Sequence, residues 1–159
     1  MKSALLTGMM IAGVGFAILG GTLSVMAQDS KEAAVKTRQD FMKAQGADVK
    51  AITDYSKGQG EQAAALTAAN DLVARAPKIA ALFPAGTSST DFPGKSNAKP
   101  EIWTDMEKFK AIPTALQAEA TKLVDAVKSG NQQAVTDQLG AMGKAGCGAC
   151  HGTYRVKTS

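Results

Sequence analysis

Both cysteines of this 159-residue chain and its only histidine fall within five consecutive residues, Cys147-Gly148-Ala149-Cys150-His151. Cys-x-x-Cys-His is the pattern that attaches a c-type haem. Its two thiols bond to the porphyrin edge, and the adjacent imidazole binds the iron. Side chains three residues apart share one face of a helix, so both sulfurs can reach the same edge. The motif therefore predicts one covalent haem c, held by Cys147 and Cys150, with His151 as an axial ligand.

Other uses of a Cys-x-x-Cys pair fit this sequence less well. A redox dithiol of the thioredoxin type lies near a strand–helix–strand pattern, and no alternating strand pattern occurs in this chain. A structural zinc site takes four ligands, whereas the chain supplies only three Cys and His side chains. A chance motif in a helical interaction module without haem is the remaining alternative.

The N-terminal residues 1–27 are typical of a secretory signal peptide. Lys2 precedes an uncharged segment of apolar and small residues, 5–25, and the small residues that end at Ala27 favour cleavage there. A retained membrane anchor is the alternative, since the segment is about long enough to span a bilayer. We expect cleavage, export to the periplasm and one mature domain over residues 28–159. This domain would touch a membrane only through an uncleaved signal.

The charged residues give little information about partners. The formal net charge is +4, and the basic residues are scattered rather than clustered, so we expect no binding to nucleic acid. Exported proteins often carry disulfides. Here both cysteines belong to the haem motif, so none is expected.

Apolar residues recur at steps of three and four along most of the chain, which predicts an all-α fold. The first helix should run from Asp29 to about Tyr55, and the second from Glu61 to Phe83. Pro77 should kink the second helix or end it early. Residues 84–99 are rich in Gly, Ser, Thr, Asp, Asn and Pro, which predicts a long loop that could wrap a cofactor edge.

Two further helices complete the pattern. The third should begin at Pro100 and continue to Lys128, with Pro113 as a kink rather than a break, because the apolar periodicity continues past it. Ser129-Gly130-Asn131 should end it and cap a fourth helix that runs from Asn131 to about Lys157. Four amphipathic helices with two short connections and one long one predict an antiparallel four-helix bundle. The haem would lie in the bundle core, attached to the last helix.

Three segments of the sequence resemble those of a known family. Val35-Lys36-Thr37-Arg38-Gln39, Lys99-Pro100-Glu101-Ile102-Trp103 and Cys147 to Arg155 match, in that order and spacing, the class II cytochromes c. These are cytochrome c′ and cytochrome c-556, and the resemblance covers essentially all of residues 28–159. It implies a haem-carrying four-helix bundle, with a homodimer through the first two helices as a plausible assembly. Pro113 departs from the family pattern.

The two branches of this family differ at the residue that faces the open side of the haem. In cytochrome c′ this residue is apolar, and the five-coordinate iron can take up gases such as NO. In cytochrome c-556 it is a methionine that becomes the sixth ligand. Counting four residues on from Arg38, the matching position is Met42, so the resemblance implies the c-556 branch.

The three methionines of residues 28–159 can also be compared physically. Met142 lies nine residues before His151, about 13.5 Å along one helix, and cannot reach the opposite face of the same iron. Met106 lies on a long apolar stripe, where core packing explains it. Met42 lies one helical turn after Arg38, so the two can face the same way. Core packing is the alternative for Met42 as well.

Five more residues are candidates for contacts with the haem. Arg38 could hydrogen-bond a propionate bidentately while Met42 meets the iron, and Gln39 could support a propionate or fill a polar position. Trp103 could pack on the haem edge or serve structural packing alone, and Tyr154 should pack near the haem. Arg155 shares a helical face with the histidine and lies either on that side of the haem or in solvent.

These observations lead us to expect a periplasmic electron-transfer cytochrome with a low-spin haem ligated by His151 and Met42. With both axial positions filled, no enzyme activity is expected, and the partners would be redox proteins that the sequence does not identify. The alternative is a cytochrome c′-like five-coordinate haem protein that binds NO or CO. A peroxidase-like enzyme is least favoured, because no second histidine exists to act as a distal acid or base.

Overall fold

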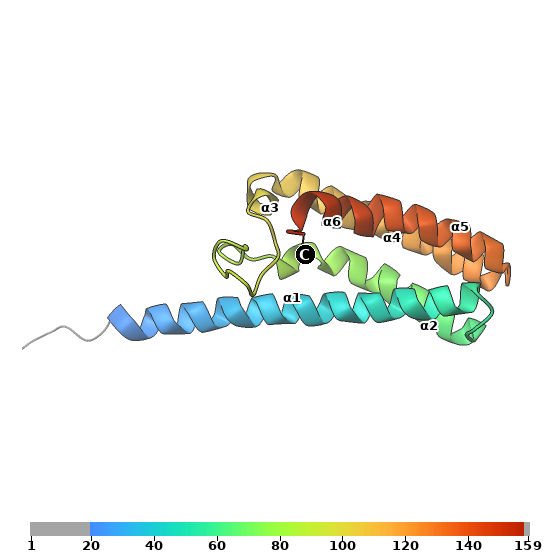
Figure 1. Cartoon of the computed structure of the whole chain (residues 1–159), viewed down its shortest axis with the longest axis horizontal. Helices are drawn as coiled ribbons and strands as arrows, with labels where there is room; N and C mark the ends of the chain where they lie inside the picture. The colour runs from blue at the N-terminus through green and yellow to red at the C-terminus, as the bar shows by residue number, and fades with distance from the viewer. Residues whose placement is uncertain (1–19, 158–159) are drawn as a thin grey trace, which may run out of the picture.

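The computed structural model describes residues 20–157, with side chains from residue 28. Four long helical segments form an antiparallel bundle (Figure 1). They are α1 (Gly20–Ser56), α2 (Gln62–Arg75), α4 (Met106–Lys128) and α5 (Gln132–Met142), and α5 continues through the π-helical segment η3 (Gly143–Gly148) into α6 (Ala149–Tyr154). The predicted all-α bundle is confirmed.

The predicted signal peptide falls mostly on residues 1–19, which lie outside the described residues, and it stays a prediction. α1 begins at Gly20, earlier than the start expected at Asp29. No proline occurs in residues 20–28 to end the helix there. Within the described chain, every helix is too short or too polar to span a bilayer.

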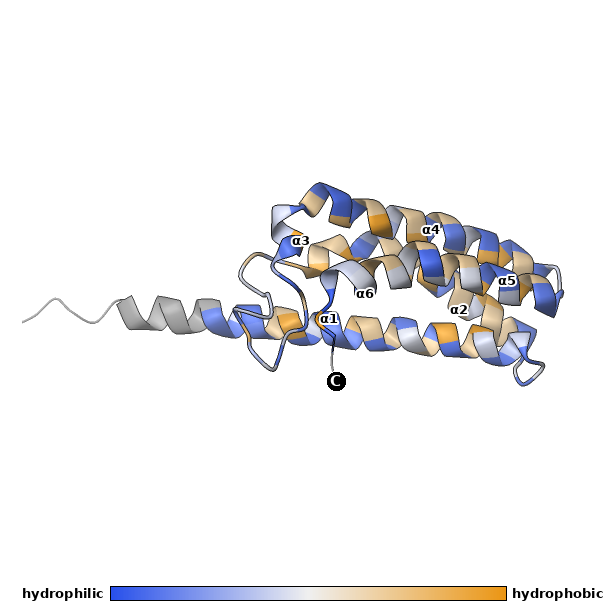
Figure 2. Ribbon diagram, turned by 45° about the horizontal axis from the view of Figure 1, so that its top comes forward, coloured by the Kyte–Doolittle hydropathy of each residue, from blue (hydrophilic) through white to orange (hydrophobic). Residues whose placement is uncertain are grey.

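The core lies between two layers of helices, with α1 and α2 on one side and α4 and α5 on the other (Figure 1). α2 packs on α1 and α4, and α5 packs on α4 and α1. Hydrophilic and hydrophobic residues alternate along each helix (Figure 2), and buried hydrophobic residues from these helices form one core cluster. All four helices contribute fully buried apolar side chains, among them Ile52, Leu72, Phe109, Leu123, Val127, Val135 and Met142. Burial of these apolar faces is what stabilises the bundle.

Tight turns with left-handed backbone connect the antiparallel pairs. Gly58 has φ +73° after α1, and Gly130 has φ +72° after α4, a conformation that glycine adopts without strain. The side chain of Asn131 then accepts hydrogen bonds from the backbone N–H groups of Gln133 and Ala134, both at 3.1 Å. This is the predicted stop and cap between the third and fourth helices.

The second and third predicted helices differ from the observed ones. α2 ends at Arg75, and two 3₁₀ turns, η1 (Ala76–Lys78) and η2 (Ala80–Leu82), follow it. Pro77 lacks the N–H that an α-helix needs, so of the two outcomes expected for it, the early end is correct. The third predicted helix is broken into α3 (Glu101–Thr104) and α4, because Asp105 leaves the helical region at φ −129° and ψ 41°. α4 continues through Pro113, as predicted.

The predicted loop closes one end of the bundle and holds the C-terminal segment. The backbone N–H of Lys99 donates to the carbonyl of Tyr154 at 2.9 Å, and that of Val156 donates to the carbonyl of Asn97 at 2.8 Å. The indole N–H of Trp103 donates to the carbonyl of Phe83 at 3.0 Å. The loop, α3 and the end of α6 therefore form one connected wall (Figure 1).

Candidate functional site

The Cys-x-x-Cys-His motif spans a change of helix type. Cys147 lies in η3, whereas Cys150 and His151 lie in α6. A Cβ added at Gly146 would lie 2.7 Å from Leu116 Cδ1, so glycine lets η3 approach α4 closely. A Cβ at Gly148 would lie 2.9 Å from the carbonyl oxygen of Gly143. The glycines beside the motif therefore permit a wider helical turn packed tightly against α4.

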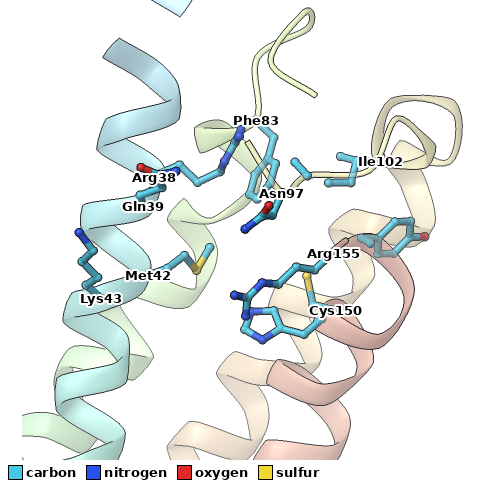
Figure 3. A pocket seen from close by; sticks show the side chains of 12 residues that line it. Arg38, Gln39, Met42, Lys43, Phe83, Asn97, Ile102, Cys150 and Arg155 are labelled. Atoms are coloured by element: carbon cyan, nitrogen blue, oxygen red, sulfur yellow. The ribbon is translucent and has the colours of Figure 1, made fainter. Parts of the chain in front are cut away.

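Two cavities meet at the motif. The outer cavity has a volume of about 540 Å³ and the inner cavity about 270 Å³. Met42, Cys150 and His151 line both. In Figure 3, Met42 extends from α1 across the outer cavity toward the side on which Cys150 lies. The structure thus brings together the predicted axial and covalent residues, with α1 on one wall and α6 on the other.

The thiols and the imidazole are held in their neutral forms. Burial raises the pKa of the Cys147 thiol, and burial together with the neighbouring Cys147 raises the pKa of Cys150 to about 11. Burial lowers the pKa of His151, and the nearby charge of Arg155 lowers it further. Neutral imidazole is the form that binds a metal. Both cysteines are free thiols, as attachment to a haem requires.

Arg38 is a buried cation beside the outer cavity. It is 5% exposed, and its guanidinium donates to the hydroxyl and the carbonyl of Thr87, both at 3.1 Å, and to Ser96 Oγ at 3.0 Å. It also lies 4.5 Å from the centroid of the Phe83 ring. Among the described residues no carboxylate forms an ion pair with it. Burial lowers the pKa of Arg38.

A buried charge is costly unless it is paired. An anionic group in the outer cavity, such as a haem propionate, would supply the missing partner of Arg38. Together with the two thiols, the neutral imidazole and the largely apolar walls, this arrangement fits a haem c. The hydrogen bonds from Arg38 to the loop were not foreseen, and the propionate contact itself stays a prediction.

The other predicted residues divide into two groups. Gln39, Tyr154 and Arg155 line the outer cavity. The exposed Gln39 amide donates to the carbonyl of Lys95 at 2.6 Å, and Tyr154 packs edge-on against Phe109 with 5.4 Å between the ring centroids. Trp103 lines neither cavity. Its indole N–H donates to the carbonyl of Phe83, which fits the structural role that the sequence left as the alternative, and a contact with the haem edge stays a prediction.

Sequence reasoning missed several lining residues, and three of them bear on the site. Phe83 and Asn97 line the outer cavity, and Gln45 lines the inner one. Gln45 follows Met42 by three residues on α1, so the helical step from Met42 would have found it. No local signal marks Asn97, because the loop path alone brings it to the cavity.

Comparison with known proteins agrees with this geometry. Residues 33–155 match the family model described as Cytochrome C'. The cytochrome c-556 of Agrobacterium tumefaciens (strain B2A) is 41% identical over 75 residues, which cover 47% of this chain and 56% of that protein. The cytochrome c′ of Pararhodospirillum photometricum is 34% identical over 133 residues, which cover 79% of this chain and 98% of that protein. The chain spans about half the length of the first curated relatives it matches.

Solved structures show the same fold. A cytochrome c′ with ligand-controlled dimer dissociation aligns with a TM-score of 0.72 and 30% identity, covering 80% of this chain and 97% of that chain. A ferrous variant of cytochrome c prime from Alcaligenes xylosoxidans with bound NO aligns with a TM-score of 0.67 and 29% identity, with the same coverage. Most of these similar proteins are named cytochrome c′ rather than c-556. They favour the alternative function expected from the sequence over the His/Met one.

Proposed function

The chain belongs to the cytochrome c′ family of covalent haem c proteins, and from this premise we propose that it is a periplasmic, cytochrome c′-like haem protein. His151 would bind the iron on one face, and the Met42 face would take up a small ligand such as NO or CO. The observation that carries the proposal is the match to cytochromes c′ over residues 33–155, together with the NO complex among the similar structures.

Each residue of the site has a defined task in this proposal. When bound, the haem supplies an iron that can change oxidation state and accept a ligand on a free face. Cys147 and Cys150 would hold the porphyrin on η3 and α6, and the neutral imidazole of His151 would bind the iron. Arg38 would offer its buried positive charge to a propionate. The apolar walls of the inner cavity would exclude water from the ring.

Electron transfer with a low-spin His/Met haem is the second candidate, and one specific observation favours it. The Met42 side chain extends from α1 across the outer cavity toward the side of Cys150 (Figure 3), and His151, the residue after Cys150, lines the same cavity. A thioether in that place can fill the sixth position and raise the reduction potential. The iron would then cycle between oxidation states without a change of ligands. The two candidates therefore differ only in whether Met42 binds the iron.

Absorption spectra of the haem-loaded protein separate the candidates. A high-spin spectrum that shifts on adding CO to the ferrous form supports the cytochrome c′-like function. A low-spin ferric spectrum with a sulfur-to-iron band, unchanged by CO in the ferrous form, overturns it in favour of electron transfer. Absence of covalent haem after periplasmic maturation would overturn both and support a helical module without haem.

Substitutions of methionine sharpen this test. If Met42 binds the iron, Met42→Leu converts a low-spin spectrum to a high-spin one that binds CO. Met106→Leu is the matched control, because Met106 lies in α4 and lines neither cavity. An unchanged low-spin spectrum in Met42→Leu would exclude Met42 as the ligand.

Three further proposals accompany the main one. We propose a homodimer through α1 and α2, supported by the dimer named for one similar structure and tested by sedimentation at graded protein concentration. Redox proteins are the partners proposed for the electron-transfer candidate. We propose no enzyme activity, since the single histidine of the chain serves as the proximal ligand and leaves no second imidazole for acid–base chemistry.

A further inference from the structure

Gln45 is a buried polar residue on the α1 wall of the inner cavity. It is 9% exposed and lies three residues after Met42, on the same side of the helix. Both side chains line the inner cavity, and Cys147, Cys150 and His151 line it as well. Gln45 therefore belongs to the wall that faces the Met42 side of the haem site, opposite the proximal histidine.

The amide nitrogen of Gln45 has no acceptor. Nε2 is buried and lacks a hydrogen-bond partner among the described residues. The polar lining groups, Cys147, Cys150 and His151, are those assigned to the haem. The other lining side chains of α1, α2, η1–η2 and α4 carry no acceptor stronger than the Met42 thioether: Met42, Val49, Leu72, Ile79, Ile112, Pro113 and Leu116. An unsatisfied buried donor costs about 1–3 kcal/mol. A group that fills the cavity and carries an acceptor atom would remove this cost.

Asp48 is the nearest competing explanation. It lies three residues further along α1, and its buried Oδ2 also lacks a hydrogen-bond partner. This oxygen is 3.4 Å from a guanidinium nitrogen of Arg75, so its charge is directed toward α2. Asp48 lines neither cavity. The two residues are neighbours on α1, but their polar atoms have different surroundings: the Asp48 carboxylate is directed toward Arg75, and Gln45 lines the inner cavity.

We propose that the Gln45 amide N–H donates a hydrogen bond to the group that occupies the Met42 side of the haem iron. This inference rests on the proposed function. In an open site the acceptor is a bound diatomic ligand, and in a closed site it is the Met42 sulfur. Hydrogen-bond donors on that side are one of the means by which a protein sets ligand preference and reduction potential. Gln45 is thus a residue that determines specificity at this site.

The test uses Met42→Ala protein, because in this variant the Met42 side of the iron is open whether or not Met42 binds the iron in the unsubstituted protein. In haem-loaded Met42→Ala protein, the ferrous CO complex is measured by infrared spectroscopy with Gln45 or with Gln45→Leu. A donor near the CO oxygen lowers the C–O stretching frequency by favouring electron donation from iron to CO. We expect Gln45→Leu to raise this frequency and to speed CO dissociation. A purely structural role for Gln45 would not move the frequency in this direction.

Gln133→Leu is the matched control outside the haem site. Gln133 is exposed on α5 and lines neither cavity, and its amide donates to Asp137 Oδ1 at 2.9 Å, so the frequency should stay unchanged. Gln45→Ala serves as a second apolar variant if Gln45→Leu loses its haem.

The outcomes distinguish a failure of the Gln45 proposal from a failure of the proposed haem function. CO binding with the same frequency in both Gln45 variants overturns the role of Gln45 and leaves the haem function intact. An equal shift in Gln133→Leu also overturns it, since the effect would not be local. If Met42→Ala protein carries haem but binds no CO, the cytochrome c′-like function fails, and the inference fails with it.

Discussion

The two ends of the bundle are built on different principles. At the end that holds the Gly58 and Gly130 turns, which we call the turn end, apolar side chains fill the space between the helices. Ala65, Ala69 and Ala120 are fully buried there, and such small residues let α1, α2 and α4 approach closely. The opposite end, called the cavity end, carries the Cys-x-x-Cys-His motif and both cavities.

The polar groups show the same contrast. The cavity end buries Arg38 without an anionic partner and Gln45 with an unpaired amide nitrogen. At the turn end, the described buried core is apolar and the polar caps lie at the surface, as Asn131 does. A closed apolar core is stable by itself. A cavity with unpaired polar groups becomes stable when a bound ligand pairs with those groups. The cavity end is therefore the part of the protein that is built to bind the cofactor.

The largest effect is expected from a variant that cannot attach the haem at the cavity end. In the double variant Cys147→Ala with Cys150→Ala, no haem should remain attached after denaturation. We expect amide exchange to speed up in the loop and α6 while Leu123 and Val127 stay protected, because stability differs between the parts of a fold. Haem staining of a denaturing gel and hydrogen exchange measure both. Uniform loss of protection would contradict the comparison of the two ends.

The second prediction concerns a substitution that destabilises the turn end and leaves the cavity end unchanged. Leu123 is fully buried, and Leu123→Ala should lower the free energy of unfolding by about 2–5 kcal/mol through lost burial and a residual cavity. The haem spectrum should not change. Denaturant unfolding and absorption spectra give the two readouts. Thr121→Ala, at an exposed position of α4, is the control and should alter stability only slightly.

The third prediction concerns the close approach of η3 to α4 beside the cavity. In Gly146→Ala the new methyl group would lie 2.7 Å from Leu116 Cδ1 and 2.9 Å from Leu116 Cβ. We expect a loss of about 1–3 kcal/mol in stability from overpacking and a shifted haem spectrum. Gly143→Ala is the matched control in the same segment, because nothing lies within 4 Å of its added Cβ. Equal effects of the two variants would refute the steric explanation.

The smallest effect is expected from the helix cap at the surface of the turn end. Asn131→Ala removes the side-chain acceptor from the first turn of α5 and should cost about 1 kcal/mol, with no change in the haem spectrum. Thermal unfolding measures the loss. Asn131→Asp keeps an acceptor oxygen, so this variant should retain most of the stability, and a loss equal to that of alanine would show that the cap contributes nothing.

The sequence determined the features that depend on local pattern. Helical periodicity gave the all-α bundle, and the spacing of Cys147, Cys150 and His151 gave the cofactor. A step of four residues placed Arg38 and Met42 on one face of α1, and both line the outer cavity. Pro77 marked the end of regular helix in α2, although its effect was expected as one of two outcomes.

Only the tertiary structure decided the contacts between distant segments. Arg38 hydrogen-bonds Thr87 and Ser96, which lie 49 and 58 residues away, and Gln45 is left without a partner because of what surrounds it. The sequence prediction also contained neither the break at Asp105 nor the π-helical η3. Periodicity reports which side of a helix is apolar. It does not report which group from another segment arrives there, because hydrogen bonds and steric fit depend on the folded path of the whole chain.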